Sequence, residues 1–139
     1  MIINYKNLVQ KAKSHLTISN KCPNIVFCFG LTQDPLNGNY LLVMFKMDMN
    51  LRKYLIQNYN QFTWKEKVKI TSGIINALLA IHKENSIHRD LHSGNILYSK
   101  YRNHWYISDL RFCGPAEKPL GSIYGNLPYI APDLCLRYL

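Results

Sequence analysis

Polar side chains able to move a proton or hold a cation gather between His88 and Asn95. The segment reads histidine, arginine, aspartate, leucine, histidine, serine, glycine, asparagine, and a further carboxylate, Asp109, follows fourteen residues after Asn95. An aspartate can accept a proton, and carboxylate and amide oxygens are the hard ligands that Mg²⁺ prefers. A long amphipathic stretch precedes this segment and a short apolar one follows it, so a helix and a strand must position it.

The elements around this segment follow an α+β order rather than a repeating βαβ order. Thr63 and Glu66 have the spacing of a capping box at the start of the long helix, on which five apolar residues can share one face: Trp64, Val68, Ile75, Leu78 and Leu79. The expected elements, in order, are a helix over 4–16, a hairpin of strands 25–29 and 40–45, helices over 51–59 and from Thr63 to about Lys83, and short strands over 96–98 and 105–107.

The composition favours a globular protein that works inside the cell. The chain has 139 residues, of which 47% are hydrophobic and 18% charged. No apolar run is long enough to cross a bilayer, and lysines interrupt any signal-peptide core near the N-terminus. We therefore expect a cytoplasmic location and no membrane partner. The four cysteines form no C-x-x-C pair, which favours reduced thiols over a zinc site.

The net charge of +9 reflects a scarcity of acidic residues. Only eight Asp and Glu occur, the first being Asp34, and the basic residues are spread along the chain instead of forming one block. A nucleic-acid-binding function would rest on net charge alone, so no nucleic-acid partner is expected.

Three motifs in order give the chain a family resemblance. The segment from His88 to Asn95 matches H-R-D-L-x-x-x-N at every fixed position, Asp109 stands where the aspartate of D-F-G belongs, and residues 125–133 resemble the segment that ends in A-P-E. On these residues the chain resembles the eukaryotic protein kinases, most closely the Ser/Thr and tyrosine-kinase-like groups. The resemblance implies a protein-kinase-like α+β fold, truncated at both ends. It has a partial N-lobe over residues 1–45, with a helix and a hairpin, and a partial, mainly helical C-lobe over residues 46–139.

The resemblance also implies a reaction, the ATP- and Mg²⁺-dependent transfer of a phosphoryl group to a protein substrate. Asp90 would accept or orient the proton of the substrate hydroxyl, and Asn95 and Asp109 would bind Mg²⁺ at the phosphates. Arg89 would pair with an anionic group on the activation segment. The expected partners are therefore a protein substrate or signalling protein.

The same resemblance implies where the adenine would lie. Leu97 would lie against its face, and Met44 would be the gatekeeper at the end of the second hairpin strand. The backbone of Phe45 and Met47 would meet its edge. The expected cofactor-binding residues are Met44, Phe45, Met47, Asn95, Leu97 and Asp109.

Each assignment has a structural alternative, and the substrate residue is open. Asp90 could form only a turn, Asp109 could only cap the preceding strand, and Asn95 could hydrogen-bond its own loop without a metal. His92 matches neither the lysine usual in Ser/Thr kinases nor the residues usual in tyrosine kinases. The run of residues 127–132 favours the Ser/Thr class.

Several parts of the kinase pattern are missing. The chain has no G-x-G-x-x-G and no V-A-I-K lysine, and residues 1–33 hold no carboxylate, so the Lys–Glu ion pair of kinases cannot form there. Lys11 stands near the place of the glutamate. Arg111 replaces the glycine of D-F-G, whose backbone freedom a side chain resists, and we hypothesise that it weakens metal binding. A catalytically inactive binding or scaffold module is the alternative reading.

Overall fold

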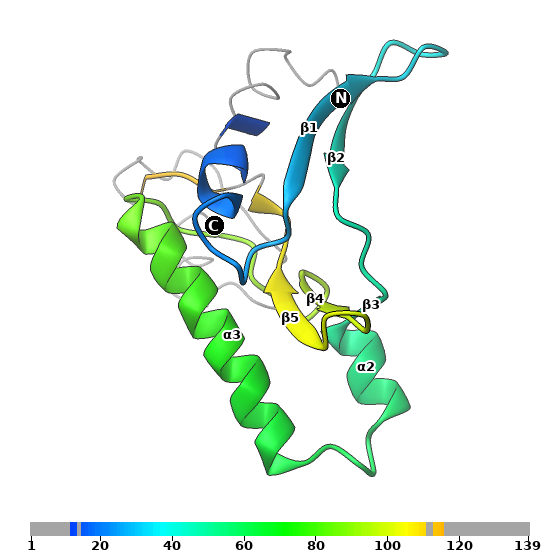
Figure 1. The fold of residues 1–139 in the computed structure, drawn as a ribbon, viewed down its shortest axis with the longest axis vertical. Coiled ribbons are helices and arrows are strands. Elements are labelled where there is room, and N and C mark those ends of the chain that lie inside the picture. The colour runs from blue at the N-terminus through cyan, green and yellow to red at the C-terminus, as the bar shows by residue number, and fades with distance from the viewer. Residues whose placement is uncertain (1–11, 14, 111–112, 116–139) are drawn as a thin grey trace, which may run out of the picture.

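Two small antiparallel sheets and a long helix make up most of the fold. The computed structural model describes residues 12–13, 15–110 and 113–115. Figure 1 shows the β1–β2 hairpin standing above a second sheet, with α3 running alongside β5. The elements are a helical segment at 12–13 and 15–19, β1 (Cys28–Gln33), β2 (Tyr40–Met44), β3 (Met49–Asn50), α2 (Leu51–Gln57), α3 (Trp64–Lys83), β4 (Ile96–Ser99) and β5 (His104–Ile107). The expected α+β order is confirmed.

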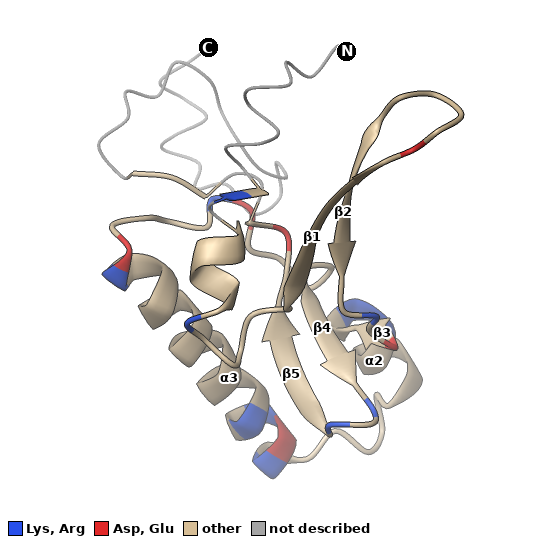
Figure 2. Cartoon of the chain, turned by 45° about the horizontal axis from the view of Figure 1, so that its top comes forward, with Lys and Arg blue, Asp and Glu red and all other residues tan. Residues whose placement is uncertain are grey.

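The β1–β2 hairpin forms around its predicted turn. The strands pair in antiparallel fashion from Cys28 opposite Met44 to Gln33 opposite Tyr40. In the turn, the Gly38 N–H donates to the carbonyl of Asp34 at 2.8 Å, and Gly38 has a φ of +70°. Asp34 is the hairpin's charged residue and gives the red stretch near its tip in Figure 2.

The first strand of the hairpin begins later than the sequence indicated. Ile25 was expected to start this strand, but it forms an isolated parallel bridge with Ile107 at the end of β5. The Val26 N–H likewise donates to the carbonyl of Ile107 at 2.9 Å. The apolar run 25–29 therefore divides between two sheets, because its first residues pair with β5 and its last belong to β1.

The second sheet has the strand order β3–β4–β5, with both pairings antiparallel. β4 and β5 confirm the two expected short strands, whereas the two-residue β3 was not expected. Asn50 ends β3 and caps α2, because its side-chain oxygen accepts a hydrogen bond from the Lys53 N–H at 2.9 Å. α2 ends at Gln57, two residues before the expected end at 59.

The capping box predicted for α3 is present. The Thr63 hydroxyl oxygen accepts a hydrogen bond from the Glu66 N–H at 3.3 Å, and the Thr63 N–H donates to the Glu66 carboxylate at 2.9 Å. The same carboxylate accepts the Tyr54 hydroxyl at 2.6 Å, which ties α3 to α2. This hydrogen bond is the main reason that the pKa of Tyr54 is raised to about 12.

The face of α3 that packs on the sheet is not the apolar face expected from the sequence. Four of the five residues proposed for that face are exposed, with Trp64 at 76%, and only Leu78 packs against the core. The buried residues of α3 lie on another side: Ile70, Gly73, Ala77 and Ile81. Both sides of this helix are apolar, so the periodicity alone could not show which one meets the strands.

The core consists of two clusters along the buried face of α3, because Ala77 and Ile81 belong to one and Ile70 to the other. One lies under the helical segment and contains Ile18, Cys22, Ile25, Ala77, Ile81, Ile107 and Leu110; the other contains Ile70, Ile96 and Trp105 with half-buried neighbours from α2. Gly73 brings helix and strand close, since a Cβ there would lie 3.6 Å from the carbonyl oxygen of Trp105. No helix in the described part of the chain is long and apolar enough to span a membrane.

Candidate active site

His88 fixes the start of the loop that carries the sequence motif, residues 88–95. Its side chain is buried, its Nδ1 accepts the Asp90 N–H at 3.2 Å, and its Nε2 donates to the carbonyl of Ser108 at 2.9 Å. Both bonds require the neutral ring with its proton on Nε2. Burial lowers the pKa of His88, which favours the same neutral form. The histidine thus joins the 88–95 loop to the end of β5.

Arg89 ties the same loop to the residues that follow Asp109. Its guanidinium donates to the backbone carbonyl of Pro115, and Ile87 exchanges two backbone hydrogen bonds with Gly114 at 2.9 and 3.3 Å. Arg89 has a φ of +65°, a left-handed conformation that is unusual for a non-glycine residue. The anionic group expected to pair with Arg89 belongs to residues 116–139, which lie outside the described part of the chain.

Asn95 is the central side chain of the 88–95 loop. Its Nδ2 donates to the backbone carbonyl of Asp90 at 2.9 Å and lies 3.4 Å from the Asp90 carboxylate. The backbone carbonyl of Asn95 accepts the backbone N–H of Ser108 at 2.9 Å and the Ser108 hydroxyl at 3.2 Å. Because the amide nitrogen is directed at Asp90, the amide oxygen faces the other way and is available to a different ligand.

The Asp90 carboxylate lies in a small polar group with His92. Its Oδ1 is 3.8 Å from the Nε2 of His92, and the same Nε2 is 3.0 Å from the Nδ2 of Asn95. The Gly94 N–H donates to the other ring nitrogen of His92 at 3.0 Å. His92, which the sequence could not assign to a substrate class, therefore helps to position the loop around Asp90.

A cavity of about 580 Å³, the large cavity, lies between the hairpin and the 88–95 loop. All six residues expected to bind the cofactor line it, from three separate parts of the chain: Met44, Phe45, Met47, Asn95, Leu97 and Asp109. Asp90 and Arg89 do not line the large cavity. Asp90 is linked to it by Asn95, a lining residue whose Nδ2 donates to the backbone carbonyl of Asp90. The remaining lining residues, which the sequence did not single out, are His15, Val26, Leu42, Met49, Asn50, Gly94 and Ser108.

His15 is the least expected residue in the wall of the large cavity. It is only 2% exposed, and its Nε2 lies 3.0 Å from the carbonyl of Val26. Burial lowers its pKa, an effect opposed by that hydrogen bond and by the negative charge of Asp109. The helix was expected to end at residue 16, but its helical residues run to 19. The spacing of Ala12, His15 and Ile18, all buried, is the signal that could have placed His15 on the inner face.

The donor set of the large cavity suits a cation that needs few protein ligands. Asp109 has a φ of +61° and offers a carboxylate on the same cavity as the Asn95 amide. Among residues 12–13, 15–110 and 113–115, no three His, Cys, Asp or Glu side chains come together as a metal site. Mg²⁺ is commonly held by one or two carboxylates together with substrate phosphates and water, whereas zinc sites need three or four protein ligands.

Two departures from the motif pattern lie outside the described residues. Arg111, proposed to weaken metal binding, and Lys11, near the place of the kinase glutamate, are among them. The residues 125–133 that resemble the A-P-E segment are also among them. Leu110, in the D-F-G phenylalanine position, is described and fully buried in the core.

Known proteins resemble this chain along nearly its whole length. A family model described as Protein kinase domain matches residues 3–138. The chain is 34% identical over 104 residues to the kinase and exchange factor for Rac A of Dictyostelium discoideum, which covers 75% of this chain and 8% of that protein. It is 28% identical over 141 aligned residues to the probable serine/threonine-protein kinase fnkB of the same organism, covering 98% of this chain and 26% of that protein.

A vertebrate relative gives the same assignment. Over 70 residues the chain is 34% identical to the dual serine/threonine and tyrosine protein kinase of Pimephales promelas, covering 50% of this chain and 8% of that protein. The chain thus spans about a quarter or less of the length of these relatives. Because the family model matches nearly every residue and the three motifs stand in its order, this chain belongs to the protein kinase family.

Proposed function

We propose that this protein kinase domain binds ATP with Mg²⁺ in the large cavity and transfers the terminal phosphoryl group to a serine or threonine of a protein substrate. The observation that supports it most is the meeting of six expected residues, from three parts of the chain, on one cavity of about 580 Å³. A cavity of this size lies within the range of small-molecule sites.

The β2–β3 linker, residues 45–48, offers a backbone donor and acceptor for the edge of an adenine. The Phe45 N–H donates to the carbonyl of Phe27 at 2.9 Å, so this residue has only its carbonyl left for a ligand. The Met47 N–H has no acceptor among the described residues. A carbonyl and an N–H two residues apart can recognise an amino group and a ring nitrogen of a planar base.

In this proposal Asn95 and Asp109 hold the metal, and Asp90 receives the substrate. Mg²⁺ would neutralise charge on the ATP phosphates. The side-chain amide of Asn95 can offer its oxygen to Mg²⁺, because its nitrogen is directed at Asp90 and its oxygen faces away. Asp90, held through its own carbonyl by Asn95, would orient the substrate hydroxyl and accept its proton.

The first experiment is a thermal-shift titration of the 139-residue chain with ATP, with and without Mg²⁺. Ligand that binds only the folded form raises the melting temperature with the logarithm of its concentration. We expect a Mg²⁺-dependent rise that Asp109→Asn abolishes. The matched control is Asp34→Asn, which removes the same charge in the hairpin turn, where Asp34 accepts the Leu36 N–H at 2.9 Å. Equal loss of the shift in both variants would overturn the proposal.

The transfer step is tested with radiolabelled ATP and a mixture of serine-, threonine- and tyrosine-containing peptides. We expect labelling of serine or threonine, reduced at least about a hundredfold in Asp90→Asn, the scale of a lost general base. Nucleotide binding by this variant should be retained because Asp90 does not line the large cavity.

A binding module without phosphoryl transfer is the second candidate function. It is favoured by the absence of any carboxylate in residues 1–33 and by the neutral His15 in the cavity wall. ATP-dependent stabilisation without labelling of any peptide would select this candidate.

The proposal also includes two expectations from the sequence. One is a division into a partial N-lobe over residues 1–45 and a partial C-lobe over residues 46–139. The other is a cytoplasmic location, which the free thiols of Cys22, Cys28 and Cys113 favour.

A further inference from the structure

A second cavity of about 310 Å³, the small cavity, meets the large cavity at the β2–β3 linker. Phe45 and Met47 line both cavities. The residues around the small cavity come from the end of the helical segment, the stretch before β1, the linker, the β4–β5 turn and β5: Ser19, Cys22, Pro23, Ile25, Phe27, Phe45, Met47, Arg102, His104 and Tyr106. Its volume is at the lower end of small-ligand sites, which run from about 300 to 1,000 Å³.

Aromatic rings form much of the wall of the small cavity. His104 meets Tyr106 edge-on, with ring centroids 4.9 Å apart, and Phe27 is partly exposed beside Phe45. Phe27 is also held in an edge-to-face contact with Phe29 at 5.1 Å. Rings fixed in this way offer faces and edges to another flat ring, and such contacts favour a planar aromatic ligand over an aliphatic one.

The charge at the rim of the small cavity is positive. The Arg102 guanidinium lies over the Phe45 ring, 4.7 Å from its centroid. Arg102 takes part in neither of the ion pairs of the described residues, which join Lys21 to Glu84 and His92 to Asp90. No carboxylate lines this cavity.

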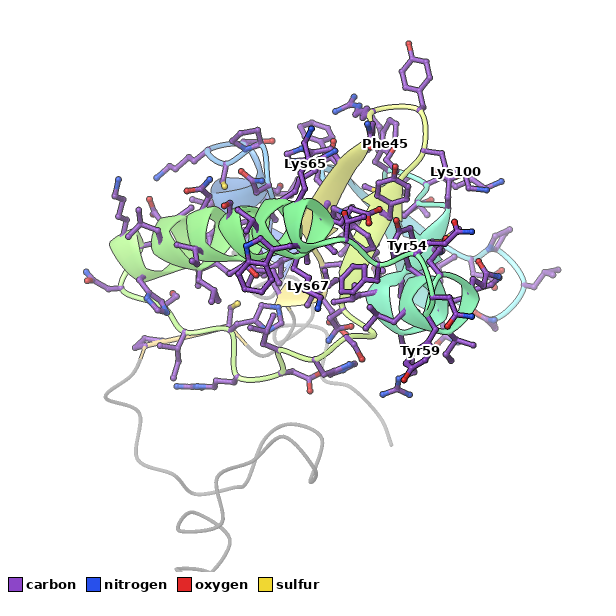
Figure 3. The ribbon with its side chains drawn as sticks, turned by 90° about the horizontal axis from the view of Figure 1, so that it is seen from below. Phe45, Tyr54, Tyr59, Lys65, Lys67 and Lys100 are labelled. Atoms are coloured by element: carbon purple, nitrogen blue, oxygen red, sulfur yellow. The ribbon has the colours of Figure 1, made fainter. Side chains whose placement is uncertain are left out.

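The surroundings of Arg102 add to this positive field. Figure 2 shows the turn between β4 and β5 carrying basic residues and no acidic ones, and Figure 3 shows Phe45 beside this turn. The ammonium of Lys69 donates to the carbonyl of Asn103 in the turn at 2.6 Å. The Asp48 carboxylate offsets part of this field, because it lies at the same turn and accepts the backbone N–H of Lys100 at 2.7 Å.

His104 supplies a second polar side chain to the lining of the small cavity. Its Nε2 accepts the side-chain N–H of the buried Asn24 at 2.8 Å, so the proton of the neutral ring is on Nδ1. Burial lowers the pKa of His104, and the positive charges of Lys69 and Arg102 lower it further. The ring is thus a neutral donor in a region that attracts anions.

We propose that the small cavity binds a small planar aromatic carboxylate, with its ring among Phe27, Phe45 and Tyr106 and its carboxylate on Arg102. Binding there changes nucleotide affinity, because Phe45 and Met47 contact both ligands. Binding of the carboxylate depends only on the small cavity, whereas its effect on nucleotide affinity rests on the proposed function. Such coupling is reciprocal, so nucleotide must change the affinity of the carboxylate by the same factor.

The probe is 2-naphthoate, titrated into the 139-residue chain by calorimetry at fixed salt, with 2-naphthamide as the uncharged probe of the same shape. We expect 2-naphthoate to bind and 2-naphthamide to bind at least about tenfold more weakly. Arg102→Gln should weaken 2-naphthoate by about tenfold or more. The matched control, Lys100→Gln, removes the same charge from the same turn without touching the lining, and should leave the Kd within about twofold.

Equal weakening by the two variants, equal binding of the two probes, or no binding by the folded chain would overturn the site. Addition of saturating ATP and Mg²⁺ tests the coupling, which predicts a changed Kd for 2-naphthoate. An unchanged Kd in protein that binds ATP overturns the coupling. If the chain binds 2-naphthoate through Arg102 but binds no ATP, the small-cavity site stands and the proposed function fails.

Discussion

The two walls of the large cavity are built in different ways. The 88–95 loop and the end of β5 are held by buried groups, since His88 and Asn95 each form hydrogen bonds with Ser108 and Leu110 is fully buried. The β1–β2 hairpin is a two-stranded sheet whose apolar side chains reach solvent on both faces, as with Phe29 at 62%.

The difference indicates which wall of the site is fixed and which is adaptable. A two-stranded hairpin is marginally stable by itself, and regions with few buried apolar contacts open at lower free energy than the core. We therefore expect the residues proposed for catalysis to keep their geometry while the hairpin changes its position. The following predictions compare the two walls.

The largest contrast should come from the same truncation made in each wall. Leu110→Ala removes a fully buried side chain and should lower the free energy of unfolding by about 2–5 kcal/mol. Leu41→Ala removes a side chain that is 49% exposed and should cost less than about 1 kcal/mol. Urea unfolding of both variants measures the difference. Similar losses would mean that the hairpin belongs to the same cooperative core.

A smaller contrast should appear on acidification, because two buried histidines belong to the wall opposite the hairpin: His15 lines the large cavity and His88 donates to its lining residue Ser108. β1 and β2 contain no histidine. Burial lowers the pKa of both histidines below the ordinary 6.5, so the unfolded chain binds more protons than the folded chain. Stability is therefore complete above pH 6.5 and falls as the pH drops through that value toward 5.

Urea unfolding at several pH values from 7.5 to 5 tests this. His15→Gln should flatten the dependence, because glutamine can still donate to the carbonyl of Val26 and does not titrate. The exposed His82, replaced in the same way, is the control and should leave the dependence unchanged. A profile that His15→Gln leaves as steep as before would contradict the assignment.

The smallest effect should be confined to the hairpin. Gly38 has a φ of +70°, so Gly38→Ala should cost about 1 kcal/mol locally. Amide hydrogen exchange should become faster in β1 and β2 but stay unchanged in β4 and β5. Leu36→Ala, in the same turn and almost fully exposed, is the control. Faster exchange throughout would show that the two walls open together.

The features that sequence reasoning found are those set by neighbouring residues. The capping box of Thr63 and Glu66, the turn at 34–38 and the 88–95 loop depend on side chains within a few positions of one another. The six expected residues of the large cavity came from the family resemblance, which carries information about distant parts of the chain that no local pattern contains.

The features that it missed depend on partners far along the chain. β3 has two residues and exists because it pairs with β4. β1 begins at Cys28 and not at the expected Ile25, because Ile25 pairs with Ile107. α3 is apolar on two sides, and only its packing on β5 shows which side is buried. His15 carries a polar side chain on an inner helical face, and its acceptor, Val26, is eleven residues away.

The left-handed backbone at Asp109 limits which substitutions at this position leave the local backbone unstrained. Aspartate, asparagine and glycine tolerate its φ of +61°, whereas β-branched residues resist it. One nucleotide change converts an aspartate codon to asparagine, glycine or valine. Asparagine and glycine would remove the charge and leave the backbone unstrained. Valine would remove the charge and also strain the backbone. If Asp109 holds the metal as proposed, variants with asparagine or glycine would fold but lose metal binding, and the variant with valine would also be destabilised.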